Sequence, residues 1–259
     1  MSSDGFRHRL GILTIHNDPV PEIEFWRAAP PSASVHTARF QTPRPTGTEF
    51  TGLELDQLIA GTGLERSVAQ LGDLGVDCIC FCFVSSSVFG GPAFDEEFIR
   101  WAEAIAGCRV TTAGLAIREA LRVVGAQKIA VLAPPWFTPP TIEATGRYLA
   151  PAGMEIVQAV QFELGPEWDG IDRPDLFDRG ARWAIEASQV HAQAVAGVEP
   201  GLDTLLIPGS GFASAQAARS ISATLRLPVL TANACSLWHS LRLTGFFGMD
   251  AGREFLLAG

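Results

Sequence analysis

A run of three serines follows a short apolar segment in the first half of the chain. Residues 78–84 read CICFCFV, Ser85, Ser86 and Ser87 come next, and two glycines stand at 90–91. Apolar residues on both faces predict a strand of a parallel sheet that helices cover on both sides. Because ligands of such folds bind at the carboxyl ends of strands, we expect the serines to lie in a ligand-binding loop. The alternative is a plain tight turn.

A second loop of the same kind follows the apolar segment Thr204–Ile207. It contains Gly209, Ser210 and Gly211. Successive backbone N–H groups in such a loop can form a concave site that favours anions, and the Ser210 hydroxyl is a further donor. The alternative is that these are only small loop residues.

The end of the first predicted strand, His8–Thr14, carries two more polar candidates. His16 is a candidate acid or base because imidazole titrates near neutral pH. Asn17 is a candidate hydrogen-bonding residue for a substrate, with a turn residue as the alternative. Cys82 is the third candidate for catalysis, together with His16 and Ser85. No serine has a His/Asp partner at a motif spacing, so a hydrolase triad is unsupported.

The two loops occupy corresponding places in an internal repeat. Gly75-Val76-Asp77 parallels Gly201-Leu202-Asp203, and six residues beyond each aspartate stand Phe83 and Gly209. Other pairs recur at an offset of 120 residues: Thr111 and Thr231, Leu121 and Leu241, Arg122 and Arg242, Gly125 and Gly245. Fixed offsets of this kind indicate a repeated structural unit.

Strands and helices alternate in both halves, which predicts parallel sheets with right-handed crossovers. We therefore expect an α/β fold of two pseudo-symmetric Rossmann-like lobes with the site in the cleft between them. The first lobe is expected at 1–125, with 228–259 packing back on it, and the second at 126–227. Within the first lobe the spacing predicts helices over 53–74 and 94–106.

The sequence from Gly90 to Pro134, GGPAFDEEFIRWAEAIAGCRVTTAGLAIREALRVVGAQKIAVLAP, resembles the aspartate/glutamate racemase superfamily. The closing run LPVLTANACSLWHSLRLTG resembles its last strand and helix. The branch that the chain resembles most contains the arylmalonate decarboxylases and maleate cis-trans isomerases. The resemblance implies an enzyme without a cofactor, in which one or two cysteines, one per lobe, act as acid, base or nucleophile. It also implies that amides and hydroxyls around them bind a carboxylate.

The chain departs from that pattern at its centre. The two cysteine positions of the family fall on Phe83 and Gly209, the same pair that the internal repeat gives. Cys82 stands one residue early, and strand alternation points it to the opposite face from Phe83. Ser85 matches the family's loop serine, and Asn17 matches an asparagine that the isomerase branch uses near its substrate.

Composition limits the class of protein. The chain has 259 residues, is 47% hydrophobic and carries a formal charge of −9, which argues against nucleic-acid and anionic-membrane partners. Its N-terminal apolar run is too short for a signal peptide, so we expect a cytoplasmic protein. The five cysteines and the absence of CxxC and HExxH motifs predict neither a disulfide framework nor a metal site. The family often forms dimers or larger assemblies, so a homo-oligomer is a further expectation.

Three functional hypotheses follow. The first is a cofactor-independent isomerase, racemase or decarboxylase acting on a small carboxylic or dicarboxylic acid. The second is an altered reaction on the same scaffold, such as hydrolysis or elimination, as in a branch tied to ectoine degradation. The third is a small-carboxylate binder without catalysis. The polar donors at both loops favour an enzyme, and the loss of both cysteine positions favours a binder.

Overall fold

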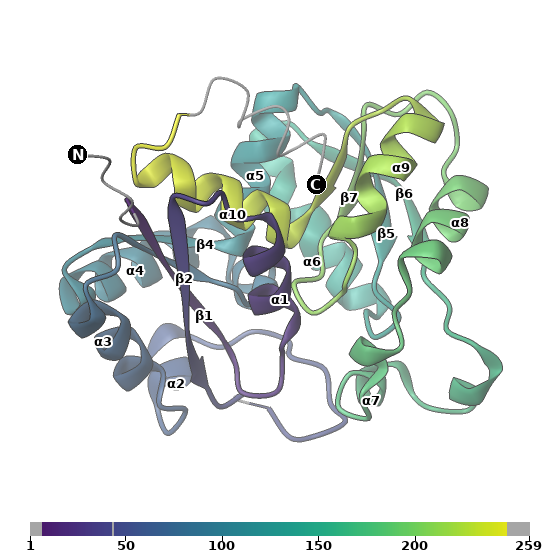
Figure 1. Ribbon diagram of the computed structural model, residues 1–259. Coiled ribbons are helices and arrows are strands. Elements are labelled where there is room, and N and C mark those ends of the chain that lie inside the picture. The colour runs from purple at the N-terminus through teal and green to yellow at the C-terminus, as the bar shows by residue number, and fades with distance from the viewer. Residues whose placement is uncertain (1–6, 43, 248–259) are drawn as a thin grey trace.

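The computed structural model describes residues 7–42 and 44–247, which form two four-stranded parallel sheets side by side (Figure 1). The first sheet has the strand order β2-β1-β3-β4. Its strands are β1 (His8–Ile15), β2 (Ala33–Phe40), β3 (Cys78–Phe81) and β4 (Arg109–Thr112). β1 and β3 lie in the middle of the sheet, and their residues are almost all buried because helices cover both faces.

The second sheet repeats the first. Its order is β6-β5-β7-β8, so each lobe places its first strand between its second and third. The strands are β5 (Lys128–Ala133), β6 (Glu155–Gln161), β7 (Thr204–Ile207) and β8 (Val229–Thr231). The expected α/β fold of two similar lobes with parallel sheets is thereby confirmed.

Two aspartates anchor corresponding strands in the two lobes. Asp77 accepts a hydrogen bond from the Arg9 backbone N–H at 2.8 Å and donates its own N–H to the Arg9 carbonyl. Asp203 makes the same pair of bonds with Lys128, at 2.7 and 2.9 Å. The two aspartates that marked the repeat in the sequence therefore bind the start of β3 to β1 and the start of β7 to β5.

Ten α-helices connect the strands in the described part of the chain. Their bounds are α1 (Val20–Ala28), α2 (Leu55–Ile59), α3 (Leu64–Leu74), α4 (Val84–Ala106), α5 (Ala113–Val124), α6 (Pro139–Leu149), α7 (Arg173–Leu176), α8 (Ala187–Gly197), α9 (Ala215–Leu225) and α10 (Ala232–Leu243). Short 3-10 helices lie at 150–152, 166–168 and 181–183. None of the helices within 7–42 and 44–247 is long and apolar enough to cross a bilayer.

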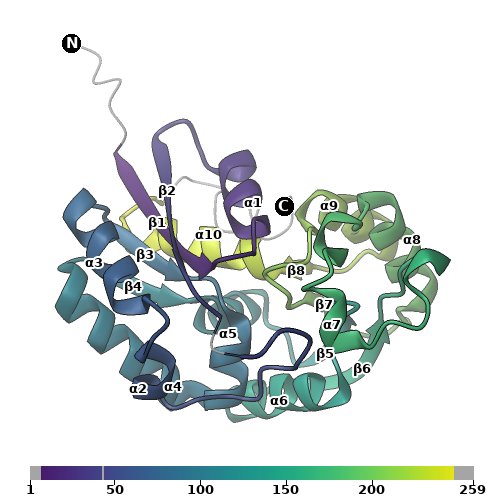
Figure 2. The ribbon, with the colours of Figure 1, turned by 90° about the horizontal axis from the view of Figure 1, so that it is seen from below.

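The segment after residue 228 divides between the lobes. β8 is an edge strand of the second sheet. α10 then packs against α1, α5 and the strands of the first sheet, and lies across that lobe in Figure 2. Of the segment 228–259 that was expected on the first lobe, α10 lies there and β8 belongs to the second sheet, while 248–259 lies outside the described residues.

Two predicted elements differ from the structure, and one helix was not predicted. The single helix expected over 53–74 is broken into α2 and α3, because Gly61 and Gly63 adopt positive φ angles of 70° and 74°. α1 was not predicted, since two prolines obscure its helical pattern and one of them stands at its start. The loop expected at Ser85–Ser87 is the first turn of α4.

The serines are helical because the chain turns directly from β3 into α4. Phe83 is the residue before the helix, and no side chain of the described residues caps its first turn. Gly91, with φ 74°, interrupts α4 for a single residue before Pro92. The two glycines therefore mark a kink within α4 and do not begin a loop.

The paired helices α5 and α10 refine the repeat. Thr112 caps α5 by accepting from the Leu115 N–H at 3.1 Å, and Thr231 caps α10 by accepting from Ala234 at 3.3 Å. The structural partner of Thr231 is thus Thr112, where the sequence offset had indicated Thr111. Gly125 directly follows α5, whereas Thr244 stands between α10 and Gly245. This one additional residue restores the offset of 120 between the two glycines.

A buried carboxylate connects the lobes behind the cleft. Asp95 of α4 accepts hydrogen bonds from Ser87 and Thr112, both at 2.7 Å, and from Tyr148 of α6 at 2.5 Å. Burial raises the pKa of Asp95 against the lowering effect of these donors. Since Tyr148 belongs to the second lobe, this network fixes how the two lobes face each other.

Candidate functional site

A pocket opens between the lobes where four loops meet. Part of its lining stands at or just beyond the ends of β1, β3, β5 and β7, namely Ile15 and Asp18, Phe83 to Ser85, Trp136 and Phe137, and Gly209 to Gly211. These positions are the carboxyl ends of the central strands in both sheets. The pocket therefore lies where parallel α/β folds place their ligands.

The first lobe contributes one apolar and one polar wall. Phe83 is 9% exposed, lines the pocket, and packs edge-on to Phe50 with ring centroids 4.9 Å apart. Ser85, two residues further along the chain, is half-buried at the pocket. The backbone N–H groups of Val84 and Ser85 have no acceptor among the described residues, as expected at the start of a helix. These donors are available to an anion in the pocket.

The second lobe places its own free donors opposite. Within the described chain, the N–H groups of Gly209, Ser210 and Gly211 meet no acceptor, and all three residues line the pocket. The Ser210 hydroxyl donates to the Cys82 carbonyl at 3.3 Å, so this loop is tied to the first lobe. A Cβ on Gly209 would stand 2.4 Å from Cγ of Pro134, which leaves no room for any side chain there. Position 209, where we expected the counterpart of a family cysteine, is thus closed to any side chain by packing.

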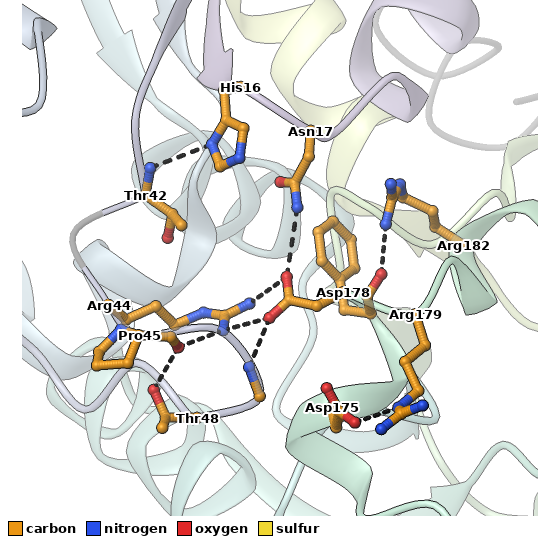
Figure 3. A network of polar contacts seen from close by, with 12 residues as sticks. His16, Asn17, Thr42, Arg44, Pro45, Thr48, Asp175, Asp178, Arg179 and Arg182 are labelled. Atoms are coloured by element: carbon orange, nitrogen blue, oxygen red, sulfur yellow. Dashed lines mark hydrogen bonds and ion pairs between the residues drawn. The ribbon is translucent and has the colours of Figure 1, made fainter.

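A loop between β2 and α2 closes one side of the pocket and is fixed by an ion pair across the lobes (Figure 3). Arg44 donates to both carboxylate oxygens of Asp178, at 2.7 and 3.1 Å, and the Gly47 N–H donates to the same group at 2.9 Å. Burial acts to raise the pKa of Asp178, but the hydrogen bonds from Arg44 and Gly47 outweigh burial and lower this pKa. Arg44 lines the pocket, but its charge is already paired.

Among the described residues, two acidic side chains line the pocket. Glu49 accepts hydrogen bonds from the Thr138 and Thr141 hydroxyls of the second lobe. Asp18 is 3% exposed and accepts from the Val20 N–H at 3.0 Å. Burial raises the pKa of Asp18 to about 7, and this effect exceeds the lowering by the Val20 hydrogen bond and by Arg182.

A second buried carboxylate supports the Gly209–Gly211 loop from behind. Glu24 of α1 accepts from the backbone N–H groups of Ser214 and Ala215, both at 2.9 Å, and from the Asn233 amide at 2.7 Å. Asn233 in turn donates to the Ser210 carbonyl at 2.8 Å. Glu24 and Asn233 therefore hold the loop without lining the pocket, and we assign them a positioning role.

Cys82 does not fit the catalytic role considered from the sequence. Its side chain is fully buried and packs with Leu10, Leu237 and Cys80 on the face away from Phe83. The hydrogen bond to Cys80 at 3.6 Å, followed by burial, raises the pKa of the Cys82 thiol. A thiol that stays protonated is a poor nucleophile or base. None of the five cysteines lines the described pocket.

His16 and Asn17 lie beside the pocket and do not line it within the described part of the chain. His16 is exposed, its Nδ1 accepts from the Thr42 N–H at 3.4 Å, and partial burial lowers its pKa. Asn17 donates to Asp178 at 3.3 Å and so belongs to the loop-closing contacts of Figure 3. The residue of this turn that reaches the pocket is Asp18.

The remaining serines also separate by role. Ser86 is 2% exposed and its hydroxyl finds no partner among the described residues, while Ser87 is fully buried on Asp95. Neither lines the pocket, because successive positions of a helix point in different directions. Of the predicted binding residues, the structure brings together Ser85, Gly209, Ser210 and Gly211.

Sequence reasoning missed several lining residues. Asp18 directly follows Asn17, so its place just after the first predicted strand could have identified it as a candidate in the same way. Phe177 lies in a stretch, after the loop 162–174, that was expected to be part of a helix, and nothing marked it as a site residue; its ring packs edge-on to Trp136 with centroids 5.1 Å apart. Glu24, which supports the Gly209–Gly211 loop without lining the pocket, was missed as well, because α1 itself was not predicted.

The sequence model of one family, described as arylmalonate decarboxylase, matches residues 56–256, which is most of the chain. The chain belongs to the arylmalonate decarboxylase family. No curated protein sequence matches it. Membership of this family indicates an enzyme of the decarboxylase kind.

Solved structures with the same fold come from this group. A maleate isomerase from Pseudomonas putida S16, crystallised with maleate, superposes with a TM-score of 0.74 at 17% identity, covering 96% of this chain and 97% of that one. An arylmalonate decarboxylase gives 0.70 at 17% identity, covering 93% and 94%. A Nocardia farcinica maleate cis-trans isomerase, in a structure with a covalently bound succinylcysteine intermediate, gives 0.72 at 22%, covering 92% and 93%. At these identities the matches establish the fold.

Proposed function

We propose that this member of the arylmalonate decarboxylase family is a cofactor-independent decarboxylase of a small dicarboxylic acid with an apolar substituent. The observation that carries the proposal is the pairing of free backbone donors across one pocket. Val84 and Ser85 provide them from the first lobe, and Gly209–Gly211 from the second. Preorganised donors of this kind bind a carboxylate and stabilise the negative charge that develops when the neighbouring bond breaks.

The walls of the pocket favour loss of CO₂. The apolar side chains Phe83, Trp136 and Phe177 line the same space as the donors. A carboxylate placed against such walls loses its hydration, which raises its free energy. The CO₂ that leaves is neutral and needs no hydration, so the apolar walls favour its release. The aromatic rings also suit an apolar substituent on the α-carbon. We infer that the donors hold one carboxylate and the apolar wall receives the other.

Covalent isomerisation has less support in this chain. The Nocardia farcinica enzyme was captured with a succinylcysteine, so that protein forms a bond between a cysteine and its substrate. Here no thiol lines the described pocket, and Phe83 and Gly209 occupy the two corresponding positions of the repeat. Racemisation by proton transfer needs no thiol and remains the second candidate. Asp18 and Glu49 in the same pocket are the observation that favours it.

A substrate panel tests the proposal. The purified protein is incubated with phenylmalonate, methylmalonate, malonate, maleate and the enantiomers of small α-substituted acids, and each acid is followed by NMR. We expect CO₂ and a monocarboxylic acid from a substituted malonate. Conversion of maleate to fumarate would show that the protein is an isomerase. Inversion of an enantiomer without release of CO₂ would show that it is a racemase, and either result would contradict decarboxylation.

Binding is measured on the same acids by thermal shift. A ligand at one hundred times its dissociation constant stabilises the folded state by about 2.7 kcal/mol. We expect Ser85→Ala to reduce the shift, and Ser188→Ala on the exposed face of α8 to leave it unchanged. An equal ligand-induced rise of the melting temperature in both variants would show that the Ser85 hydroxyl does not bind the carboxylate.

A further inference from the structure

The candidate pocket contains no thiol, so the proposed reaction needs another group that delivers a proton to the substrate. Among the described lining residues the ionisable side chains are those of Asp18, Arg44 and Glu49. We propose that Asp18 is the catalytic acid and donates a proton to the α-carbon after CO₂ has left. This inference rests on the function proposed above and names the residue that takes the place of the family cysteines.

The position of Asp18 fits this role. It stands just after β1, and its Oδ2 faces the second lobe, where a Cβ added to Gly211 would lie 3.1 Å away. Gly211 belongs to the loop whose free N–H groups we assign to carboxylate binding. A substrate held by that loop therefore has Asp18 as its immediate neighbour.

The carboxyl group is held in one orientation. The Asp18 N–H donates to the Ile15 carbonyl at 3.1 Å, and Nη1 of Arg39 donates to the Asp18 carbonyl at 2.8 Å. Oδ1 accepts from the Val20 N–H at 3.0 Å. Within the described chain Oδ2 accepts no hydrogen bond, so one oxygen is fixed and the other is free to carry a proton.

The surroundings keep this group unpaired. The charges that face it are Arg39 of β2, Arg182 of the 3-10 helix at 181–183 and Glu24 of α1, together with the neutral thiol of Cys82. None of the described cations forms an ion pair with it. Burial outweighs the two arginines and raises the pKa of Asp18 to about 7. A carboxyl group in this range is protonated often enough at neutral pH to act as a general acid.

The other two ionisable groups have different partners. Arg44 is bound bidentately to Asp178. Glu49 accepts hydrogen bonds from the Thr138 and Thr141 hydroxyls, which occupy its oxygens. Asp18 differs from both, because its Oδ2 lies beside Gly211 and accepts no hydrogen bond within the described chain.

The step balances without a further reactant. Loss of CO₂ breaks the bond between the α-carbon and one carboxylate and leaves the electron pair in an enediolate with the retained carboxylate. The O–H bond of protonated Asp18 then breaks, and its proton forms the new C–H bond. Asp18 is left as a carboxylate and recovers a proton from water, so each turnover consumes one proton and releases CO₂ and a monocarboxylate.

The test compares variants of the full chain with phenylmalonate as the probe. Asp18→Asn removes the proton but keeps an oxygen for the Val20 N–H. Glu49→Gln removes the other carboxylate of the pocket, and Asp73→Asn, on the exposed face of α3, is the matched control. Turnover, KM and thermal shift are measured for each, and the product formed in D₂O is examined for deuterium at the α-carbon.

We expect Asp18→Asn to lower kcat by about 100-fold or more, while KM stays within about threefold and the thermal shift persists. Asp73→Asn should match the wild type. In the wild type, kcat/KM should fall as the pH rises through about 7, a profile that does not depend on how well any variant folds. A flat profile between about pH 6 and pH 9, an active Asp18→Asn variant, or loss of turnover in Glu49→Gln alone would overturn the assignment. A wild type that consumes none of the malonates would overturn the proposed function itself.

Discussion

Asp18 and Gly211 come from different lobes and meet in the pocket, where a Cβ on Gly211 would stand 3.1 Å from Oδ2 of Asp18. The same Cβ would stand 2.6 Å from Cε2 of Phe177. Contacts below 3.0 Å force a neighbour to move, and here the neighbour is the edge of a side-chain ring. The absence of a side chain at 211 thus keeps the space beside Asp18 open.

Gly211→Ala tests that space. The added methyl group should displace Phe177 and occupy the volume beside Asp18, so substrate affinity should fall by about tenfold or more, since about 1.4 kcal/mol corresponds to that factor. The free energy of unfolding should change less, because a ring edge can shift. Equal affinity for phenylmalonate in the variant and the wild type would show that the substrate does not occupy this part of the pocket.

Gly209→Ala should instead reduce stability. Its Cβ would meet Cγ of Pro134 at 2.4 Å, and a proline beside the backbone of β5 has little freedom to move. Overpacking of this kind costs about 1–3 kcal/mol. Urea unfolding provides the measurement. Gly146→Ala on α6, where the new Cβ meets only Ile156 at 3.9 Å, is the control and should be neutral or stabilising. Similar unfolding free energies in the two variants would contradict the closed packing at 209.

Asp18→Asn should change stability in a pH-dependent manner. The pKa of Asp18 is about 7 in the folded chain against an ordinary value of 3.8, so the folded state binds the proton more tightly than the unfolded state. The resulting stabilisation is present below about pH 4 and is lost as the pH rises through 7. The difference of about three pKa units corresponds to roughly 4 kcal/mol.

The asparagine variant has no such dependence at this position. Its melting temperature should therefore rise relative to the wild type between pH 5 and pH 8. Because Glu24 and Asp95 are present in both proteins, the difference between the two melting curves isolates Asp18. A constant difference over this range would mean that Asp18 is already ionised at pH 5.

Tyr148→Phe tests the connection between the lobes. The substitution removes the hydroxyl that bonds Asp95 at 2.5 Å and leaves the ring, over which Arg118 lies 5.5 Å from the centroid. Loss of a hydrogen bond to a buried carboxylate costs about 1–3 kcal/mol. Thermal unfolding should show this loss, and ligand affinity should fall as well if the lobes no longer hold their relative position. An unchanged melting temperature would show that Ser87 and Thr112 suffice for Asp95.

The sequence predicted the arrangement of the lobes better than the chemistry of the pocket. The repeat was visible because Asp77 and Asp203 each anchor a strand through local backbone bonds, so the same residue recurs at the same place. Gly209 was found for the same reason. Strand alternation already pointed Cys82 away from Phe83, and in the structure Cys82 packs in the cluster that contains Leu10 and Leu237.

Contacts between distant segments were beyond sequence reasoning. Glu24 reaches Asn233 across 209 positions of the chain, and Arg44 reaches Asp178 across 134. Neither pair has a spacing that a motif could reveal. The distinction between Asn17 and Asp18 also required the fold, because both stand in the same turn and only one side chain lines the pocket.

The most direct test of thiol-free chemistry in this pocket is turnover after alkylation of the protein. Wild-type protein is treated with iodoacetamide, modification is checked by mass spectrometry, and phenylmalonate is then followed by ¹H NMR in D₂O. Cys108 is the one cysteine that is not buried, and it does not line the described pocket. The account predicts undiminished conversion to phenylacetate carrying deuterium at the α-carbon. Conversion that is lost in step with alkylation, or phenylmalonate that is never consumed, would contradict it.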